Sequence, residues 1–124
     1  MAKEWRRFEK RAVIWILKDA HDGDTIRPFI SLSFDEWAHP DLRFDGVYTP
    51  ELTAKDPSIR ARAFAARDRV RSLLPLGEWF TVETTLYASY AFKRFGARVW
   101  SPGGIYINQL LIDEGLGDPA PEGK

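Results

Sequence analysis

The sequence predicts a mainly β fold with helices (α+β), built on a small five-stranded barrel of the OB type. Short apolar or alternating runs typical of strands are separated by long loops. A helical pattern follows the third of these runs, and a shorter one lies near the end of the chain. Three strands, a helix, two strands and a helix, in that order, favour a small and strongly curved barrel.

The first two strands are separated by a turn signal. The apolar, β-rich run over residues 12–17 predicts a buried strand, and Asp22-Gly23-Asp24 predicts the turn that follows it. Pro28 has no amide hydrogen to donate, so the second strand should lie at an edge or carry a bulge. The five expected strands cover residues 12–17, 25–32, 42–47, 79–85 and 97–100, with a polar loop over 33–41.

Two helices are expected. Asp56 resembles an N-cap with Pro57 at the first helical position, and Pro75 and Gly77 end the helix. Asn108 is expected to cap a second helix over residues 109–114 that ends at Gly115. The apolar face of the first helix comprises Ile59, Ala63, Ala66, Val70 and Leu73/Leu74. Its other faces carry Arg60, Arg62, Arg67, Arg69 and Arg71, interpreted as a solvated surface, with a phosphate-facing stripe as the alternative.

Composition restricts the function. The chain has 124 residues, and its hydrophobic fraction of 44% supports one core and argues against global disorder. Its 18 basic and 18 acidic side chains cancel, so any contact with nucleic acid must come from a local arrangement. The absence of cysteine excludes a disulfide framework and a thiolate metal site. No apolar run is long enough to span a bilayer or resembles a signal peptide, so we expect a cytoplasmic protein without a membrane partner.

Three segments are expected along the chain. Residues 1–11 would form an N-terminal arm, residues 12–117 the folded domain, and the Pro/Gly/acid-rich residues 118–124 a flexible tail. Trp5 and Phe8 lie among basic residues of the arm and are expected to pack on the domain. A basic and aromatic finger for a nucleic-acid strand is the alternative for this arm. The oligomeric state is left open.

One stretch combines a strand pattern with residue types suited to catalysis. Arg43 lies in the third strand, and Glu51 follows Pro50 eight positions later. A guanidinium is a fixed fork of donors suited to a phosphate, and a carboxylate can take a proton from water. The stretch therefore indicates a phosphodiester-cleaving site. The structural alternative is that Arg43 pairs with Asp45 or Glu51 and meets no phosphate.

Three stretches together resemble the staphylococcal nuclease (thermonuclease) family over residues 12–117. That family has an Asp-Gly-Asp-Thr turn, an arginine eight residues before the glutamate of a Thr/Ala-Pro-Glu stretch, a later arginine, and a helix opened by asparagine that ends in Gly-Leu. The corresponding stretches here are Asp22-Gly23-Asp24-Thr25, Arg43 to Glu51 through Thr49-Pro50, and Phe92-Lys93-Arg94 followed by Asn108 to Leu116.

The resemblance implies an OB barrel that acts as a calcium-dependent phosphodiesterase on DNA or RNA, mainly single-stranded or frayed, with low sequence specificity. Arg43 and Arg94 would contact the scissile phosphate, and Glu51 would be the general base or would position the attacking water. Asp24 would bind Ca²⁺, with Thr49, through its carbonyl, and Glu51 as neighbouring ligands. Calcium prefers oxygen ligands and can polarise a phosphoryl oxygen, and fixed guanidinium donors stabilise charge in the transition state.

The chain departs from the family pattern at two points. Tyr48 stands where the family places a second calcium-binding aspartate, and a phenol is a poor substitute for a carboxylate. Calcium affinity should therefore fall unless Asp22 or Asp45 supplies the missing charge. Arg94 follows a lysine rather than a glycine, so Arg98 is the rival for the second phosphate-binding arginine.

Two other function classes remain open. A catalytically inactive OB-fold module that binds nucleic acid or a protein partner is favoured by the tyrosine at position 48. A structural subunit that docks through the Trp-rich N-terminus and the loop over residues 33–41 is the third hypothesis. Calcium-dependent digestion of denatured DNA distinguishes the nuclease from both.

Overall fold

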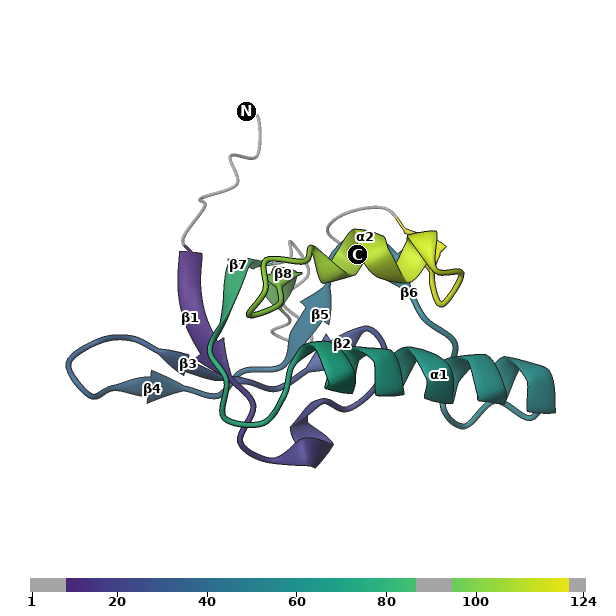
Figure 1. The fold of residues 1–124 in the computed structure, drawn as a ribbon, viewed down its shortest axis with the longest axis horizontal. Coiled ribbons are helices and arrows are strands. Elements are labelled where there is room, and N and C mark those ends of the chain that lie inside the picture. The colour runs from purple at the N-terminus through teal and green to yellow at the C-terminus, as the bar shows by residue number, and fades with distance from the viewer. Residues whose placement is uncertain (1–8, 87–94, 121–124) are drawn as a thin grey trace.

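The computed structural model describes residues 9–86 and 95–120, which form a mixed α+β fold with a curled, open β-sheet (Figure 1). The main sheet has seven strands in the order β2-β5-β8-β7-β1-β3-β4, and β6 pairs with β9 separately. The strands are β1 (Glu9–Val13), β2 (Thr25–Ile26), β3 (Phe29–Ser31), β4 (Trp37–Ala38), β5 (Leu42–Phe44), β6 (Val47–Tyr48), β7 (Phe80–Leu86), β8 (Phe95–Trp100) and β9 (Asp118–Pro119). The helices are a short 3₁₀ helix η1 (Leu17–Asp19), α1 (Pro57–Leu73) and α2 (Ile107–Asp113).

The main sheet has seven strands where five were predicted, because one predicted strand is split and one predicted loop contains a strand. Pro28 divides residues 25–32 into β2, which pairs with β5, and β3, which pairs with β1. This break agrees with the expected effect of a proline that cannot donate to a ladder. The prediction of a loop over residues 33–41 is wrong in part, since β4 pairs with β3 there. The resulting hairpin projects from the sheet at the left of Figure 1.

The first strand begins earlier than predicted. Glu9, Lys10 and Arg11 pair with β7, so these residues belong to the sheet and not to an arm. Residues 14–17, predicted to continue the strand, leave it and lead into η1. The start of β1 was not predicted as a strand, because its residues are charged and show no apolar pattern. Their side chains are exposed or half-buried, although their backbone pairs with β7. Residues 1–8, including Trp5 and Phe8, lie outside the described residues.

The predicted helix after the third strand is confirmed as α1. The Asp56 carboxylate accepts hydrogen bonds from the backbone N–H groups of Ser58 and Ile59, and Pro57 occupies the first turn. The buried face consists of Ala63, Ala66, Val70 and Leu73. Ile59 was predicted on this face but is 46% exposed, because it lies in the first turn, beyond the buried part of the helix.

The arginines of α1 make intramolecular contacts. Arg62 donates to the carbonyl oxygen of Gly115 at 2.7 Å, and Arg69 pairs with Glu114 at 2.8 Å. Arg71 donates to the carbonyl oxygen of Ala20 at 3.1 Å. These contacts anchor the helix to the end of α2 and to the loop before β2. They give the arginines a structural role instead of a phosphate-facing stripe.

Asn108 does not cap the second helix as predicted, because α2 begins one residue before it with Tyr106 at the N-cap. The Asn108 side chain is buried instead. Its amide nitrogen donates to the carbonyl oxygens of Asp45 and Ala97, and its amide oxygen accepts from the N–H of Val99. Asn108 therefore connects α2 to β8 and to the turn after β5. The predicted stop at Gly115 is confirmed by its positive φ of 73°.

The prediction of a flexible tail over residues 118–124 is wrong for its first two residues. Asp118 and Pro119 form β9, which pairs with Tyr48 and Val47 of β6. Residues 121–124 lie outside the part that the structure describes.

The hydrophobic core takes side chains from β1, β5, β7, β8 and both α-helices. Representative members are Ala12, Phe44, Val70, Val82 and Leu111. Neither α-helix within residues 9–86 and 95–120 combines the length and apolar character needed to cross a membrane.

Candidate functional site

The turn before β2 holds Asp24 in place. Its backbone N–H donates to the Asp22 carboxylate at 2.9 Å, which closes the turn locally. At Gly23 the backbone approaches α1 so closely that an added Cβ would lie 2.6 Å from Cβ of Ala66 and 2.7 Å from Cγ2 of Thr49. A glycine is therefore required here by packing. The turn directs Asp24 toward the strands β5 and β6.

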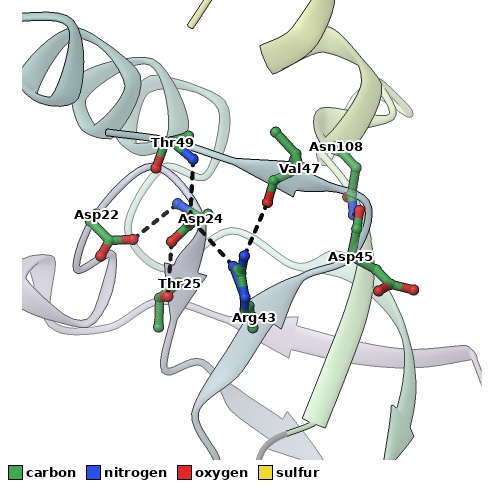
Figure 2. Close-up of polar contacts among 8 residues, drawn as sticks. All are labelled: Asp22, Asp24, Thr25, Arg43, Asp45, Val47, Thr49 and Asn108. Atoms are coloured by element: carbon green, nitrogen blue, oxygen red, sulfur yellow. Dashed lines mark hydrogen bonds and ion pairs between the residues drawn. The ribbon is translucent and has the colours of Figure 1, made fainter. Parts of the chain in front are cut away.

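Asp24, Arg43 and Thr49 come from three separate segments and meet in one cluster (Figure 2). Nη1 of Arg43 lies 3.3 Å from Oδ2 of Asp24, and the backbone N–H of Thr49 donates to the same oxygen at 3.1 Å. Oδ1 of Asp24 accepts from the hydroxyl of Thr25 at 3.1 Å. The structure thus brings together three of the five site residues predicted from the sequence.

Arg43 is buried, and its side chain has a relative exposure of only 8%. Nη2 donates to the carbonyl oxygen of Val47 at 3.5 Å, and the guanidinium carbon lies 4.5 Å from the centre of the Tyr48 ring. Tyr48 therefore covers the guanidinium through a cation–π contact instead of supplying a metal ligand. A phosphate that reached Arg43 would have to compete with Asp24 and displace this ring.

Glu51 is not joined to this cluster. It lies in the exposed turn after Pro50, where its backbone carbonyl accepts from the N–H of Ala54 at 3.1 Å. Among the described residues, the Glu51 carboxylate makes no hydrogen bond or ion pair. It is therefore open to water, which is what a general base requires.

The second predicted arginine, Arg94, lies outside the described residues. Its rival Arg98 lies on β8, whose Gly96 is the register partner of Arg43 on the neighbouring strand. Arg98 is two residues beyond Gly96, so its side chain projects from the same sheet face as Arg43. Strand spacing and rise place the Cα atoms of Arg43 and Arg98 about 8 Å apart. The register therefore makes Arg98 a possible partner of Arg43 in phosphate binding.

Asp22 is the available second carboxylate. Burial, reinforced by the charge of Asp24, raises the pKa of Asp22 to about 6. A bound cation would favour the ionised form of this pair. Asp45, the other acid considered, points away from Asp24 and Arg43 in Figure 2.

The oxygen donors at this site match calcium in kind but are few. Asp22 and Asp24 are adjacent, and the buried Thr49 hydroxyl has no hydrogen-bond partner within the described part of the chain. Residues 9–86 and 95–120 contain no group of three or more acidic, histidine or cysteine side chains that could hold a metal ion. Asp24 would also have to share its charge between the ion and Arg43. These residues fit a weak calcium site, not a tight one.

A pocket of about 450 Å³, not predicted from the sequence, opens beside the cluster. Its charged lining comprises Lys18, His21, Arg27 and Arg43 together with Asp19 and Asp41. Arg27 is paired with Asp41 at 2.7 Å. The basic side chains come from η1, the turn after it, the break between β2 and β3, and β5, so no short sequence motif could have revealed them as a group.

Comparisons with models of known protein families and with curated protein sequences find no match for this chain.

Proposed function

We propose that the chain is a calcium-dependent phosphodiesterase that hydrolyses single-stranded or frayed DNA or RNA with low sequence specificity. The observation that carries the proposal is the convergence of Asp24, Arg43 and Thr49 from three segments of the chain. The resemblance to the staphylococcal nuclease family implies that these residues share one site. Glu51, the candidate general base, is exposed and lies two residues after Thr49 in the chain.

The strand pairing supports the finer proposal of an OB-type barrel. When β2 and β3 are taken as one strand interrupted at Pro28, the five pairings β1–β3, β2–β5, β5–β8, β8–β7 and β7–β1 form a closed circuit. A circuit of five strands, with α1 between the third and fourth, is what a five-stranded barrel requires. The β4 strand would then be an extension of this barrel.

In the proposed reaction, Glu51 removes a proton from a water molecule that attacks phosphorus in line with the leaving oxygen. The P–O bond to the leaving oxygen breaks, and that oxygen takes a proton from solvent water. Arg43 and a second arginine, Arg94 or Arg98, stabilise the charge that develops on the phosphate oxygens. Asp24 holds Arg43 at the site, and with Asp22 and Thr49 would hold a calcium ion. When bound, the ion would supply Lewis-acid polarisation of a phosphoryl oxygen.

A second candidate is a catalytically inactive module that binds nucleic acid. The specific observation in its favour is the enclosure of Arg43, whose guanidinium is paired with Asp24 and covered by Tyr48. In that case the Asp24–Arg43 pair is structural, and Glu51 has no role.

The test is digestion of denatured DNA with calcium or with a chelator. We expect hydrolysis with calcium only, and a fall of at least about a hundredfold in the Glu51→Gln and Arg43→Lys variants, because lysine cannot reproduce the guanidinium fork. Arg60→Lys, which changes an exposed arginine outside the cluster, is the matched control and should retain the wild-type rate. Equal hydrolysis in chelator and calcium would exclude calcium dependence, and equal rates in Glu51→Gln and wild type would exclude Glu51 as the base. No hydrolysis under either condition would favour the inactive module.

A further inference from the structure

The lining of the pocket beside Arg43 includes three cationic side chains, Lys18, Arg27 and Arg43, and two acids, Asp19 and Asp41. Arg27 and Asp41 neutralise each other, and Asp19 lies 3.3 Å from Nε2 of His39. Lys18 and His21 are exposed, and within the described residues neither forms an ion pair or a side-chain hydrogen bond. Lys18 is thus a cationic side chain without an ion pair in this part of the chain, and with His21 as a second hydrogen-bond donor it suits a phosphate.

A group of exposed aromatic rings, which we call the tryptophan ladder, lies on the neighbouring surface. It consists of Trp15, Trp37 and Trp79, which are 49%, 39% and 40% exposed. Trp15 lies 5.0 Å from Trp37, and Trp37 stacks on Trp79 at 5.7 Å. The guanidinium of Arg11 covers Trp79 at 4.8 Å. Three tryptophans at the surface of a small domain form an exposed apolar patch, and such patches mark binding sites.

A chain of contacts connects the pocket to the ladder. His39 pairs with Asp19 of the pocket, and its ring lies 3.8 Å from that of Phe29. Phe29 in turn lies 4.9 Å from Trp15. The pocket, whose lining includes Arg43, and the aromatic rings are therefore neighbours that are joined by side-chain contacts.

We propose that this surface is the binding track for single-stranded nucleic acid, with a backbone phosphate held at Lys18 and His21 and bases stacked on Trp15 and Trp37. The inference deepens the proposed function in that it assigns the substrate strand a path to Arg43, and it stands equally if the module only binds. Exposed aromatic faces beside basic side chains are the features that bind unpaired bases without reading sequence. A duplex keeps its bases stacked internally, so it cannot use the ladder.

The neutral net charge of the chain agrees with binding through a local track. A partner protein could also cover an apolar patch, but it would not require the exposed donors Lys18 and His21 in an adjoining pocket. The ladder is therefore assigned to a strand of nucleic acid, and self-association is treated as an outcome that would overturn the assignment.

The experiment measures fluorescence anisotropy of labelled oligothymidylate in the Glu51→Gln background with chelator, so that no hydrolysis occurs. We expect Trp15→Leu, which keeps an apolar side chain but removes the ring, to weaken binding about tenfold or more. Lys18→Ala should weaken binding and reduce the salt dependence by about one ion. The matched controls Trp100→Leu and Lys55→Ala lie outside the track and should bind like the parent. Thermal unfolding of each variant verifies folding.

Equal binding of single-stranded and duplex DNA, or equal affinities of Trp15→Leu and Trp100→Leu, would overturn the track. Self-association in sedimentation that Trp15→Leu abolishes, without a loss of oligonucleotide binding, would overturn it as well. Binding along the track by a wild-type protein that never hydrolyses DNA would refute the proposed function and support the track. Hydrolysis that proceeds normally in Trp15→Leu and Lys18→Ala, with unchanged affinity, would refute the track alone.

Discussion

At the scale of single residues, Tyr48 decides what the Asp24–Arg43 cluster can do. Its ring covers Arg43 at 4.5 Å, and its phenol replaces the carboxylate that the family resemblance leads one to expect. Calcium affinity depends on the number of charged oxygen ligands, so a calcium site at this cluster would be weak. The same ring shields the guanidinium from solvent. The cluster therefore combines a buried arginine with few charged oxygens.

Replacing Tyr48 with aspartate should restore calcium binding. We expect Tyr48→Asp to increase calcium affinity about tenfold or more, because it adds a carboxylate beside Asp24. Isothermal titration calorimetry measures the change. The Tyr48→Phe variant keeps the ring without adding charge and should bind calcium as the wild type does. Identical calcium affinities in the two variants would place the ion elsewhere or exclude it.

At the scale of elements, Asn108 determines how α2 meets the sheet. Its buried amide makes three hydrogen bonds, which hold the turn after β5 against β8. Strand β5 carries Arg43, and strand β8 carries Arg98. The arginines of α1 add contacts between the two helices, through the Arg69–Glu114 pair. The site thus depends on packing between elements that are far apart in the sequence.

Removal of the Asn108 amide should destabilise the whole domain. We expect Asn108→Ala to lower the free energy of unfolding by about 3 kcal/mol, because the N–H of Val99 and the carbonyl of Asp45 lose buried partners. Chemical denaturation measures the difference. Gln109→Ala, which removes an exposed contact to Asp113 at 2.8 Å, should change the stability by less than about 0.5 kcal/mol. Equal losses for both variants would contradict the role of the buried amide.

The N-cap of α1 should make stability depend on pH. Hydrogen bonds from Ser58 lower the pKa of Asp56, so the ionised carboxylate stabilises the folded state. This contribution is present at pH above the unfolded pKa and is lost as the pH falls through the lowered folded pKa. The Tm difference between wild type and Asp56→Ala should therefore be clear at pH 7 and shrink below about pH 4. The exposed Glu78→Ala variant is the control. A Tm difference between wild type and Asp56→Ala that does not vary with pH would contradict the role of the ionised Asp56 carboxylate.

At the scale of the whole molecule, local signals predicted more than long-range ones did. The cap at Asp56 and the stop at Gly115 were recognised because their signals lie within a few residues. The placement of Asp24 and Arg43 at one site was expected only through the family resemblance, since periodicity does not pair residues across a sheet. Their ion pair was not predicted, because the partners considered for Arg43 were Asp45 and Glu51. The role of Asn108 was missed because its bond to Asp45 spans 63 positions. The tryptophan ladder joins three segments and left no pattern in the sequence.

The formal net charge of the whole chain is zero, so its charged surfaces arise from local groups of side chains. The pocket with Lys18 and His21, the Arg43 cluster and the ladder around Trp15 together form the surface that we assign to a strand of nucleic acid. Glu51 lies at the exposed turn next to this cluster in the chain. Binding and hydrolysis are separable in this proposal, because Lys18 and Trp15 are assigned to binding alone and Glu51 to hydrolysis alone.

The most direct measurement is the rate at which wild type and Glu51→Gln cleave a single-stranded oligonucleotide in the presence of calcium. The account predicts a measurable rate for the wild type and a loss of about a hundredfold or more for the variant, with both proteins binding the oligonucleotide equally well. A variant that cleaves as fast as the wild type, or a wild type that binds and never cleaves, would contradict the claim that this site performs hydrolysis.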